Sequence, residues 1–199
     1  MQCKESIIKN QPDWVELVTW NDYGESYICP VDDAGKYVPR MKYAPKPCHA
    51  GYLEINKYYI QWYKNGHPSP VERDGLVYVY RLHPKDATPT LADLDLAPSD
   101  MRKLLMSPVA ENNGRVEDAI YLTTFLTAPA DVKVTSGTTT SVHRMPAGVG
   151  QLKVPFSTGD QYFEVLRDGK QLIHLKGEPI ESAPKWYNFF STTGFAYAQ

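Results

Sequence analysis

The opening segment of the chain pairs a short helical pattern with a strand pattern. Ser6–Lys9 has the composition of a helix end, and the polar, proline-containing run Asn10–Asp13 stops it. Trp14–Trp20 is rich in β-branched and aromatic residues, so we expect a strand there. A polar turn, Asn21–Ser26, follows it. Helix, loop, strand and polar loop in this order indicate an α/β unit with its polar cluster at the carboxyl end of the strand.

A second helix is predicted after a loop rich in proline and glycine. The loop covers Pro30–Gly51. Apolar and aromatic residues then recur near helical spacing through Tyr52–Asn65, and Gly66 occupies the terminating position. Prolines at 68 and 70 mark a boundary between this α/β segment and the rest of the chain.

From Gly75 onward the pattern becomes that of an all-β domain. A short helix is expected at Ser99–Met106, inside a loop-like stretch. Asp168-Gly169-Lys170 joins two strand patterns and predicts a hairpin. Short strands separated by turn signals are typical of a β-sandwich. The expected strands are Leu76–Leu82, Ala119–Leu126, Asp131–Thr135, Thr139–Met145, Gln151–Phe156, Tyr162–Arg167 and Gln171–Lys176.

The predicted strand at Trp14–Trp20 has no parallel neighbour in this sequence. Strands of parallel sheets are buried on both faces and need such neighbours. We therefore expect the α/β segment to be a fragment of a larger unit, with exposed apolar edges that favour aggregation.

Composition excludes several classes of protein. Hydrophobic residues make up 42% and charged residues 22% of the 199 residues, as in ordinary globular proteins. The net charge is -2 with no basic run, so we expect no nucleic-acid partner. No segment approaches the ~20 apolar residues that span a bilayer, so no membrane partner is expected. Met1–Asn10 lacks the apolar core of a secretory signal.

Common catalytic and cofactor motifs are missing from the sequence. There is no phosphate-binding loop, dinucleotide fingerprint or serine-nucleophile elbow. The five histidines lack the spacing of metal ligands, so neither a metal nor a cofactor is expected. Cys3, Cys29 and Cys48 form an odd number, which defines no disulfide framework; export would permit a Cys29–Cys48 pair.

The densest chemistry lies in Trp20-Asn21-Asp22-Tyr23-Gly24-Glu25-Ser26. Glycoside cleavage needs carboxylates to protonate the leaving oxygen and to activate water, with aromatic and polar groups to hold the sugar. The alternative is a capped strand-to-helix turn, in which Asp22 or Ser26 accepts hydrogen bonds from helix N–H groups.

Residues Pro12–Ser26 closely resemble the last barrel strand of glycoside hydrolase family 71. The resemblance continues, in the right order, through Lys57–Ile60, Tyr78–Ala87, Pro146–Val149 and Leu152–Pro155. It implies a (β/α)8 barrel followed by a C-terminal β-sandwich, and inverting endo-hydrolysis of the 1,3-α-glucan of fungal cell walls. It also implies an extracellular or cell-wall location.

On this basis we expect residues 1–70 to be an α/β barrel remnant, with the last strand and its flanking helices, and residues 71–199 to be an all-β sandwich. Trp20, Asn21, Asp22, Tyr23 and Glu25 match the rim of the family's substrate cleft. The family's acid/base carboxylates lie earlier in its barrel, in an Asp-x-x-Glu motif, so no catalytic pair transfers. Asp22 and Glu25 are the catalytic candidates, but their closeness in one turn favours sugar binding or orientation of other groups.

Three hypotheses remain open at this level. The chain is a truncated or inactive form of a 1,3-α-glucanase, a non-catalytic α-glucan-binding module, or a structural sandwich without a ligand; its oligomeric state is open. For the aromatic residues Tyr58, Tyr59, Trp62 and Tyr63, core packing against barrel strands is favoured over a sugar platform. His83–Asp86 is interpreted as a strand exit with an ion pair rather than a sugar contact.

Overall fold

The computed structural model describes residues 2–17, 50–87, 117–184 and 191–199. They form two helices and eight strands. In chain order these are α1 (Gln2–Asn10), α3 (Ala50–Asn65), β1 (Gly75–Arg81), β2 (Ala119–Leu126), β3 (Ala130–Ser136), β4 (Thr139–Met145), β5 (Gly148–Pro155), β6 (Gly159–Arg167), β7 (Lys170–Ile180) and β8 (Ser191–Tyr197).

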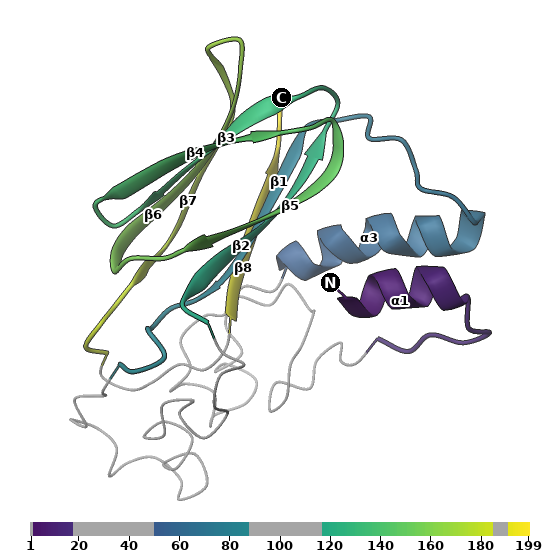
Figure 1. Cartoon of the computed structure of the whole chain (residues 1–199), viewed down its shortest axis with the longest axis horizontal. Helices are drawn as coiled ribbons and strands as arrows, with labels where there is room; N and C mark the ends of the chain where they lie inside the picture. The colour runs from purple at the N-terminus through teal and green to yellow at the C-terminus, as the bar shows by residue number, and fades with distance from the viewer. Residues whose placement is uncertain (1, 18–49, 88–116, 185–190) are drawn as a thin grey trace, which may run out of the picture.

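The strands form two four-stranded sheets, each antiparallel throughout. The first sheet has the order β5-β2-β1-β8 and the second has the order β4-β3-β6-β7. The two sheets lie face to face, and α1 and α3 run side by side along one side of the first sheet (Figure 1). This arrangement confirms the expected sandwich-like, mostly β architecture.

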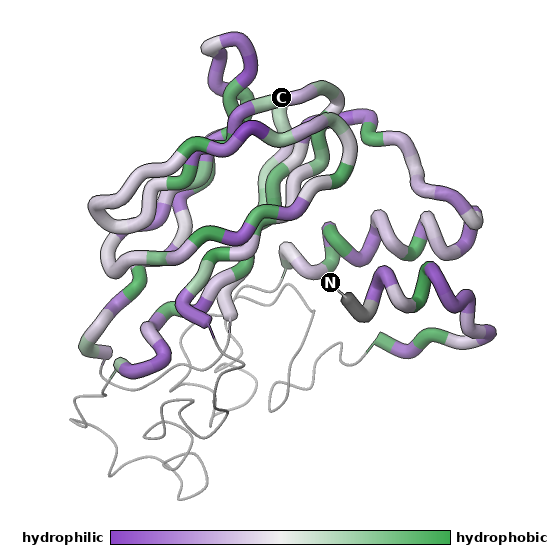
Figure 2. The backbone as a smooth tube through the Cα atoms, viewed as in Figure 1, coloured by the Kyte–Doolittle hydropathy of each residue, from purple (hydrophilic) through white to green (hydrophobic). Residues whose placement is uncertain are grey.

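The sandwich core follows from the alternation of residues along the strands. In β3 every second residue is buried, so one face of the second sheet meets the core and the other meets solvent. Figure 2 shows the same alternation of hydrophobic and hydrophilic positions along the outer strands. Tyr78 and Tyr80 reach across from β1 to Phe163 of β6, and the Tyr78 and Phe163 rings stack with centroids 4.7 Å apart.

The helix pair packs on the outer face of the first sheet. Ile55 and Tyr59 of α3 are buried against Val77 of β1 and Phe125 of β2. The rings of Tyr58 and Phe125 meet edge to face at 5.7 Å. The aromatic residues of α3 do pack into a core, as expected. The expected partner was wrong, because they contact strands of the sandwich and not strands of a barrel.

Two turns follow their sequence signals closely. Gly66 ends α3 with a φ of 73°, and its N–H donates to the carbonyl of Trp62 over 2.9 Å. Asp168 and Gly169 adopt φ values of 52° and 76°, which are the left-handed conformations that a tight hairpin between β6 and β7 requires. The predicted helix at Tyr52–Asn65 and the predicted hairpin are both confirmed.

Other expectations differ from the structure. Trp14–Leu17 forms no strand, so the prediction of a strand at Trp14–Trp20 is wrong for its described half; residues 18–20 lie outside the described residues. A strand needs a hydrogen-bonded neighbour, and no described strand of either sheet pairs with Trp14–Leu17.

All described strand pairs are antiparallel, so the barrel remnant stays a prediction. Strand β8 was not predicted, and the expected helix at Ser99–Met106 lies outside the described residues.

Candidate functional site

The residues predicted to bind sugar lie outside the part of the chain that the structure describes. These residues are Trp20, Asn21, Asp22, Tyr23 and Glu25. The segment that leads into them, Asp13–Leu17, is described. It lines a cavity of about 260 Å³ together with the two helices.

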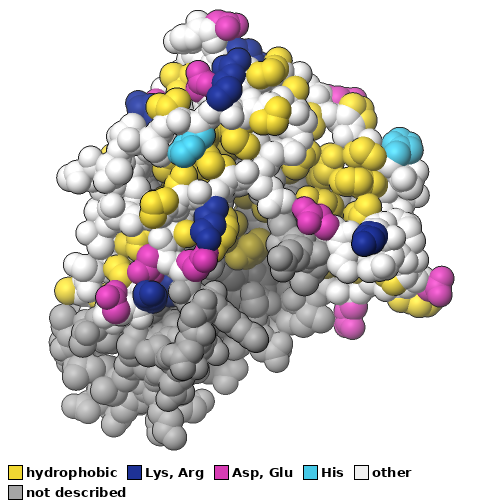
Figure 3. All heavy atoms as spheres, viewed as in Figure 1, with side chains coloured by type: hydrophobic (Ala, Val, Ile, Leu, Met, Phe, Trp, Pro, Cys, Tyr) yellow, Lys and Arg dark blue, Asp and Glu magenta, His cyan; other side chains and the backbone are white. Residues whose placement is uncertain are grey.

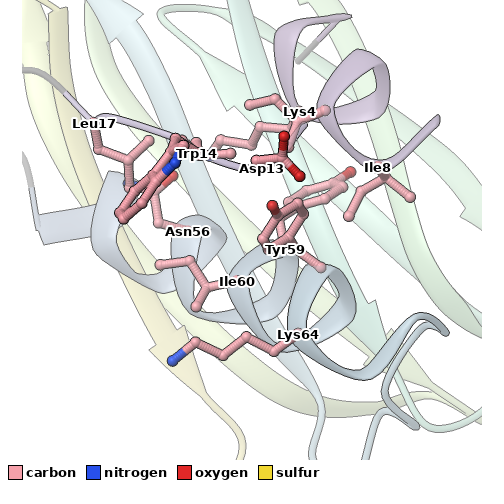
Figure 4. A pocket seen from close by; sticks show the side chains of 12 residues that line it. Lys4, Ile8, Asp13, Trp14, Leu17, Asn56, Tyr59, Ile60 and Lys64 are labelled. Carbon is pink, nitrogen blue, oxygen red and sulfur yellow. The ribbon is translucent and has the colours of Figure 1, made fainter. Parts of the chain in front are cut away.

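Three elements build this cavity, which we call the helix cavity. Helix α1 contributes Lys4, Ile7 and Ile8, and α3 contributes Asn56, Tyr59, Ile60, Tyr63 and Lys64. Figure 4 shows Trp14, Asn56, Tyr59 and Ile60 close to the cavity and Lys64 directed away from it. The indole of Trp14 is 91% exposed. The phenol of Tyr63 donates a hydrogen bond to the carbonyl of Pro12, which fixes the approach of this segment to α3.

The polar character of the helix cavity depends on three of its ionisable groups: the ammonium of Lys4, the phenol of Tyr59 and the carboxyl of Asp13. The ammonium of Lys4 lies 5.6 Å from the centroid of the Tyr59 ring, and burial lowers the pKa of Lys4 to about 8. Burial, followed by the nearby carboxylate of Glu5, raises the pKa of the Tyr59 phenol. Asp13 is the one carboxylic acid among the described residues that line this cavity.

A second hollow lies between α1, α3 and the open part of the first sheet. Its volume is about 560 Å³, and Glu5 is the one acid among the described residues that line it. Figure 3 shows a hollowed area between the sandwich and the helices, with hydrophobic side chains inside it and charged side chains close by. We call this hollow the sheet groove.

The described residues that line the two cavities do not include the acid pair that glycoside hydrolysis uses. Glycosidases place two carboxyl groups about 5–9.5 Å apart across the scissile bond. The linings of the helix cavity and of the sheet groove each contain one acid, Asp13 and Glu5 respectively. The described residues therefore supply sugar-sized cavities without an acid/base pair.

Other expected features are placed as follows. His83 is only 5% exposed, and its Nδ1 donates to the carbonyl of Glu181 over 3.2 Å, so this strand exit is a packed element and not an open sugar contact. Asp118 forms the ion pair near this exit, with Arg81 at 3.0 Å.

In the described ranges, no three His, Cys, Asp or Glu side chains gather as metal ligands would. Neither described helix is long and apolar enough to cross a membrane.

Sequence reasoning missed the polar residues of the sheet groove, among them Tyr121 and Gln151. One signal was present: Tyr121 is a large amphipathic residue inside an otherwise apolar strand pattern. Its significance depends on which part of the sheet the helices cover, and no local pattern reveals that.

Comparison with known proteins gives the chain its family. A family model described as glycosyl hydrolase family 71 matches residues 2–198. A mutanase of Penicillium rubens is 34% identical over 189 residues, which cover 93% of this chain and 40% of that protein. A glucan endo-1,3-alpha-glucosidase of Schizosaccharomyces pombe is 32% identical over 193 residues, covering 96% of this chain and 42% of that protein.

An ascus wall endo-1,3-alpha-glucanase of the same species is 31% identical over 212 residues, covering 96% of this chain and 46% of that protein. The chain thus spans less than half of the length of these relatives. No solved structure matches it significantly. Because the family model matches nearly every residue and these relatives each exceed 30% identity, the chain belongs to glycosyl hydrolase family 71.

Proposed function

We propose that this chain acts on 1,3-α-glucan as the C-terminal part of a family 71 hydrolase. The observation that carries the proposal is the match of residues 2–198 to the family, together with relatives named for mutanase and endo-1,3-α-glucanase activity. In this proposal residues 1–70 are the C-terminal remnant of the barrel, and residues 71–199 form the sandwich beside it. The protein works outside the cell or at the cell wall, where this polysaccharide lies.

The turn after Leu17 is the part that contacts the substrate in this proposal. Trp20 and Tyr23 supply ring faces, and Asn21, Asp22 and Glu25 supply hydrogen-bonding groups to glucosyl hydroxyls. Asp22 and Glu25 are also the catalytic candidates of the chain, although their spacing favours binding and orientation. The position of Asp13–Leu17 in the helix cavity supports this reading, because the segment leads directly into the turn.

A non-catalytic glucan-binding role is the second candidate. The observation that favours it is the single acid in each described cavity, Asp13 in one and Glu5 in the other. Experiment can separate the binding role from the hydrolytic role. Binding needs aromatic rings and groups that hydrogen-bond to sugar hydroxyls, whereas hydrolysis also needs a pair of carboxyl groups.

Binding and hydrolysis should be measured on the same preparation of the full 199-residue chain. We expect the chain to be retained on insoluble 1,3-α-glucan, and Trp20→Ala to reduce retention. Trp14→Ala is the matched control, because Trp14 is an exposed tryptophan only a few residues earlier in the sequence. Equal losses in both variants would mean that exposed rings merely adhere to the polymer, and absence of retention in the wild type would overturn the proposal.

Release of reducing sugar decides between the two roles. Hydrolysis that Asp22→Asn or Glu25→Gln abolishes would make these carboxylates catalytic. Retention without any release of sugar would favour the binding role. Hydrolysis that survives both substitutions would remove Asp22 and Glu25 from the catalytic candidates.

A further inference from the structure

The helices cover part of the outer face of the first sheet, and the sheet groove lies beside the covered part. Helix α3 lies over β1 and β8: the N–H of Gly51 donates to Thr193 Oγ1 over 2.9 Å, and the Tyr197 phenol donates to Glu54 Oε2 over 2.8 Å. No space remains at this contact, because a Cβ on Gly51 would lie 2.9 Å from Thr193 Cβ and from Val77 Cγ1. The same helices also pack on Phe125 of β2 and Val149 of β5, and the sheet groove lies over the neighbouring part of these strands, around Tyr121 and Gln151.

Two cross-strand rows form the floor of the sheet groove. In the first row Val79, Tyr121 and Lys153 are register partners on β1, β2 and β5. In the next row Thr123 of β2 faces Gln151 of β5. Residues opposite one another in an antiparallel sheet project on the same side, so these side chains point together toward the helices. The walls are Lys4 and Glu5 of α1 and Tyr52 and Ile55 of α3.

Tyr121 is the exception in its strand. Strand β2 is buried on both faces at every position except this one, and Tyr121 is 44% exposed. Its hydroxyl donates to Glu117 Oε2 over 2.8 Å, and the same Glu117 oxygen forms an ion pair with Lys153. The ring is therefore held in place while part of its surface stays open to the groove.

The charges around the groove favour a neutral ligand. The lining holds two lysines and one glutamate. The charge of Lys153 is met by Glu117, which lies beside the groove. Lys4 is partly buried, and this burial lowers its pKa to about 8. An anionic ligand would thus find no uncompensated cluster of cations here, in contrast to a phosphate site.

The remaining groups match a sugar. Tyr52 and Tyr121 offer amphipathic rings, and Gln151 offers an amide that both donates and accepts hydrogen bonds. Gln151 is exposed and also approaches Tyr59 and Glu5, which orients its amide at the groove edge. A glucosyl unit has an apolar face of C–H groups, which packs against an aromatic ring, and a rim of hydroxyls, which form hydrogen bonds with an amide. The volume of about 560 Å³ lies within the usual range of ligand sites.

We propose that the sheet groove binds a segment of neutral α-glucan through Tyr121 and Gln151, as a contact separate from the turn at Trp20–Glu25. The identity of the sugar as 1,3-α-linked glucose rests on the proposed function, whereas the groove itself rests on the geometry of β2 and β5. Such a contact on the sandwich holds the polymer at a second point and raises its residence on the protein.

The test titrates short 1,3-α-linked glucose oligosaccharides into the full chain, with 1,3-β-linked and 1,4-α-linked oligosaccharides in parallel. Binding is followed by calorimetry and by shifts of the backbone amide resonances of β2 and β5. We expect Tyr121→Ala to raise the Kd by about tenfold or more, as loss of a central aromatic contact does. Gln151→Ala is expected to raise it about 2- to 12-fold, the range for one hydrogen-bonding group.

Tyr162→Ala is a closely matched control. Tyr162 lies on the outer face of the second sheet, its hydroxyl donates to Asp160 Oδ2 over 3.2 Å, and Lys176 lies 3.8 Å from the same oxygen. It thus repeats the tyrosine, acid and lysine arrangement of Tyr121, yet lines neither cavity. Its Kd should equal that of the wild type. Because Gln151 is exposed, its variant keeps the test decisive even if Tyr121→Ala unfolds.

The outcomes separate this inference from the proposed function. If Tyr121→Ala and Gln151→Ala bind like the wild type while Trp20→Ala does not, the groove is not a glucan site and the proposed function stands. Tyr121-dependent binding of another linkage, without binding of the 1,3-α-linked sugar, overturns the assigned linkage and the proposed substrate together. Absence of binding to every oligosaccharide overturns the groove as a sugar site.

Discussion

The ion pair between Asp74 and Arg167 should be the strongest single polar interaction between the two sheets. Asp74 directly precedes β1, and Arg167 ends β6. The guanidinium binds both carboxylate oxygens, with Nη1 to Oδ2 and Nη2 to Oδ1 each at 2.8 Å. Arg167 Nη2 also donates to the carbonyl of Ala128 over 2.7 Å. Asp74 additionally accepts from the N–H and hydroxyl of Thr127, at 2.8 Å and 3.0 Å.

Arg167→Ala leaves this carboxylate, which is 8% exposed, with only its two bonds from Thr127. Removing one partner of a largely buried charge pair costs more than the pair itself contributes, because the other charge loses compensation. We expect a loss of about 3 kcal/mol in the free energy of unfolding, since Arg167 keeps some exposure. For a chain of this size that corresponds to a fall of about 6–12 °C in Tm.

Urea unfolding followed by circular dichroism measures this loss, with Arg144→Ala as the control. Arg144 pairs with Asp131 over 3.2 Å, but the two side chains are 60% and 43% exposed. An exposed pair contributes roughly 0–1 kcal/mol, so the control should remain close to the wild type. Equal losses in the two arginine variants would refute the argument that burial and two-point geometry make the Asp74 pair important.

The same pair predicts a pH dependence. The hydrogen bonds from Arg167 lower the pKa of Asp74 below its ordinary value. A carboxyl with a depressed pKa stabilises the fold above its unfolded pKa, and this contribution disappears as the pH falls through the folded value. The difference in unfolding free energy between the wild type and Arg167→Ala should therefore be constant near neutral pH and shrink below about pH 4.

Three further predictions concern other sites. Gly194→Ala should destabilise the protein by about 1–3 kcal/mol in urea unfolding, because a Cβ there would overlap the ring of Tyr78; an unchanged midpoint would show that the ring moves aside freely. Burial lowers the pKa of His83, so its contribution to stability should fall as the pH drops below about 6.5; a His83→Gln variant should lack that part of the loss between pH 7.5 and 5.5. Trp14→Ala should change the unfolding free energy by less than about 0.5 kcal/mol, because the indole is 91% exposed, and a larger change would mean that it packs against the protein in solution.

Local signals were sufficient to predict much of the sandwich. Ala119–Leu126 and Thr139–Met145 were predicted with the bounds that the structure has. Asp168-Gly169 predicted the hairpin between β6 and β7 because the left-handed backbone favours these residue types. Gly66 marked the end of α3 for the same reason. Each of these features depends on residues close together in the sequence.

Features that depend on distant partners were not predictable in the same way. The sequence of β8, Ser191–Tyr197, begins with small polar residues and is interrupted by Gly194, so its strand pattern is short and broken. The glycine is required because the ring of Tyr78 on the neighbouring strand occupies the space of a side chain. Trp14–Leu17 shows the reverse case, with a strong strand composition but no paired neighbour among the described strands.

The two candidate sites also differ in whether neighbouring or distant residues define them. The motif at Trp20–Ser26 was found from its composition and its resemblance to the family, and it stays a prediction because these residues lie outside the described part. The sheet groove could not be found from sequence, since it depends on how α1 and α3 pack on the first sheet and on which part of β2 and β5 they leave uncovered. The exposure of Tyr121 indicates a binding surface only once this tertiary packing is known.

Selective attachment to the polymer tests the central claim most directly. The full chain should be sedimented with insoluble 1,3-α-glucan and, in a parallel tube, with 1,3-β-glucan of the same mass. The account predicts that the protein leaves the supernatant with the α-linked polymer and stays in solution with the β-linked one. Equal partition onto both polymers, or onto neither, would contradict it.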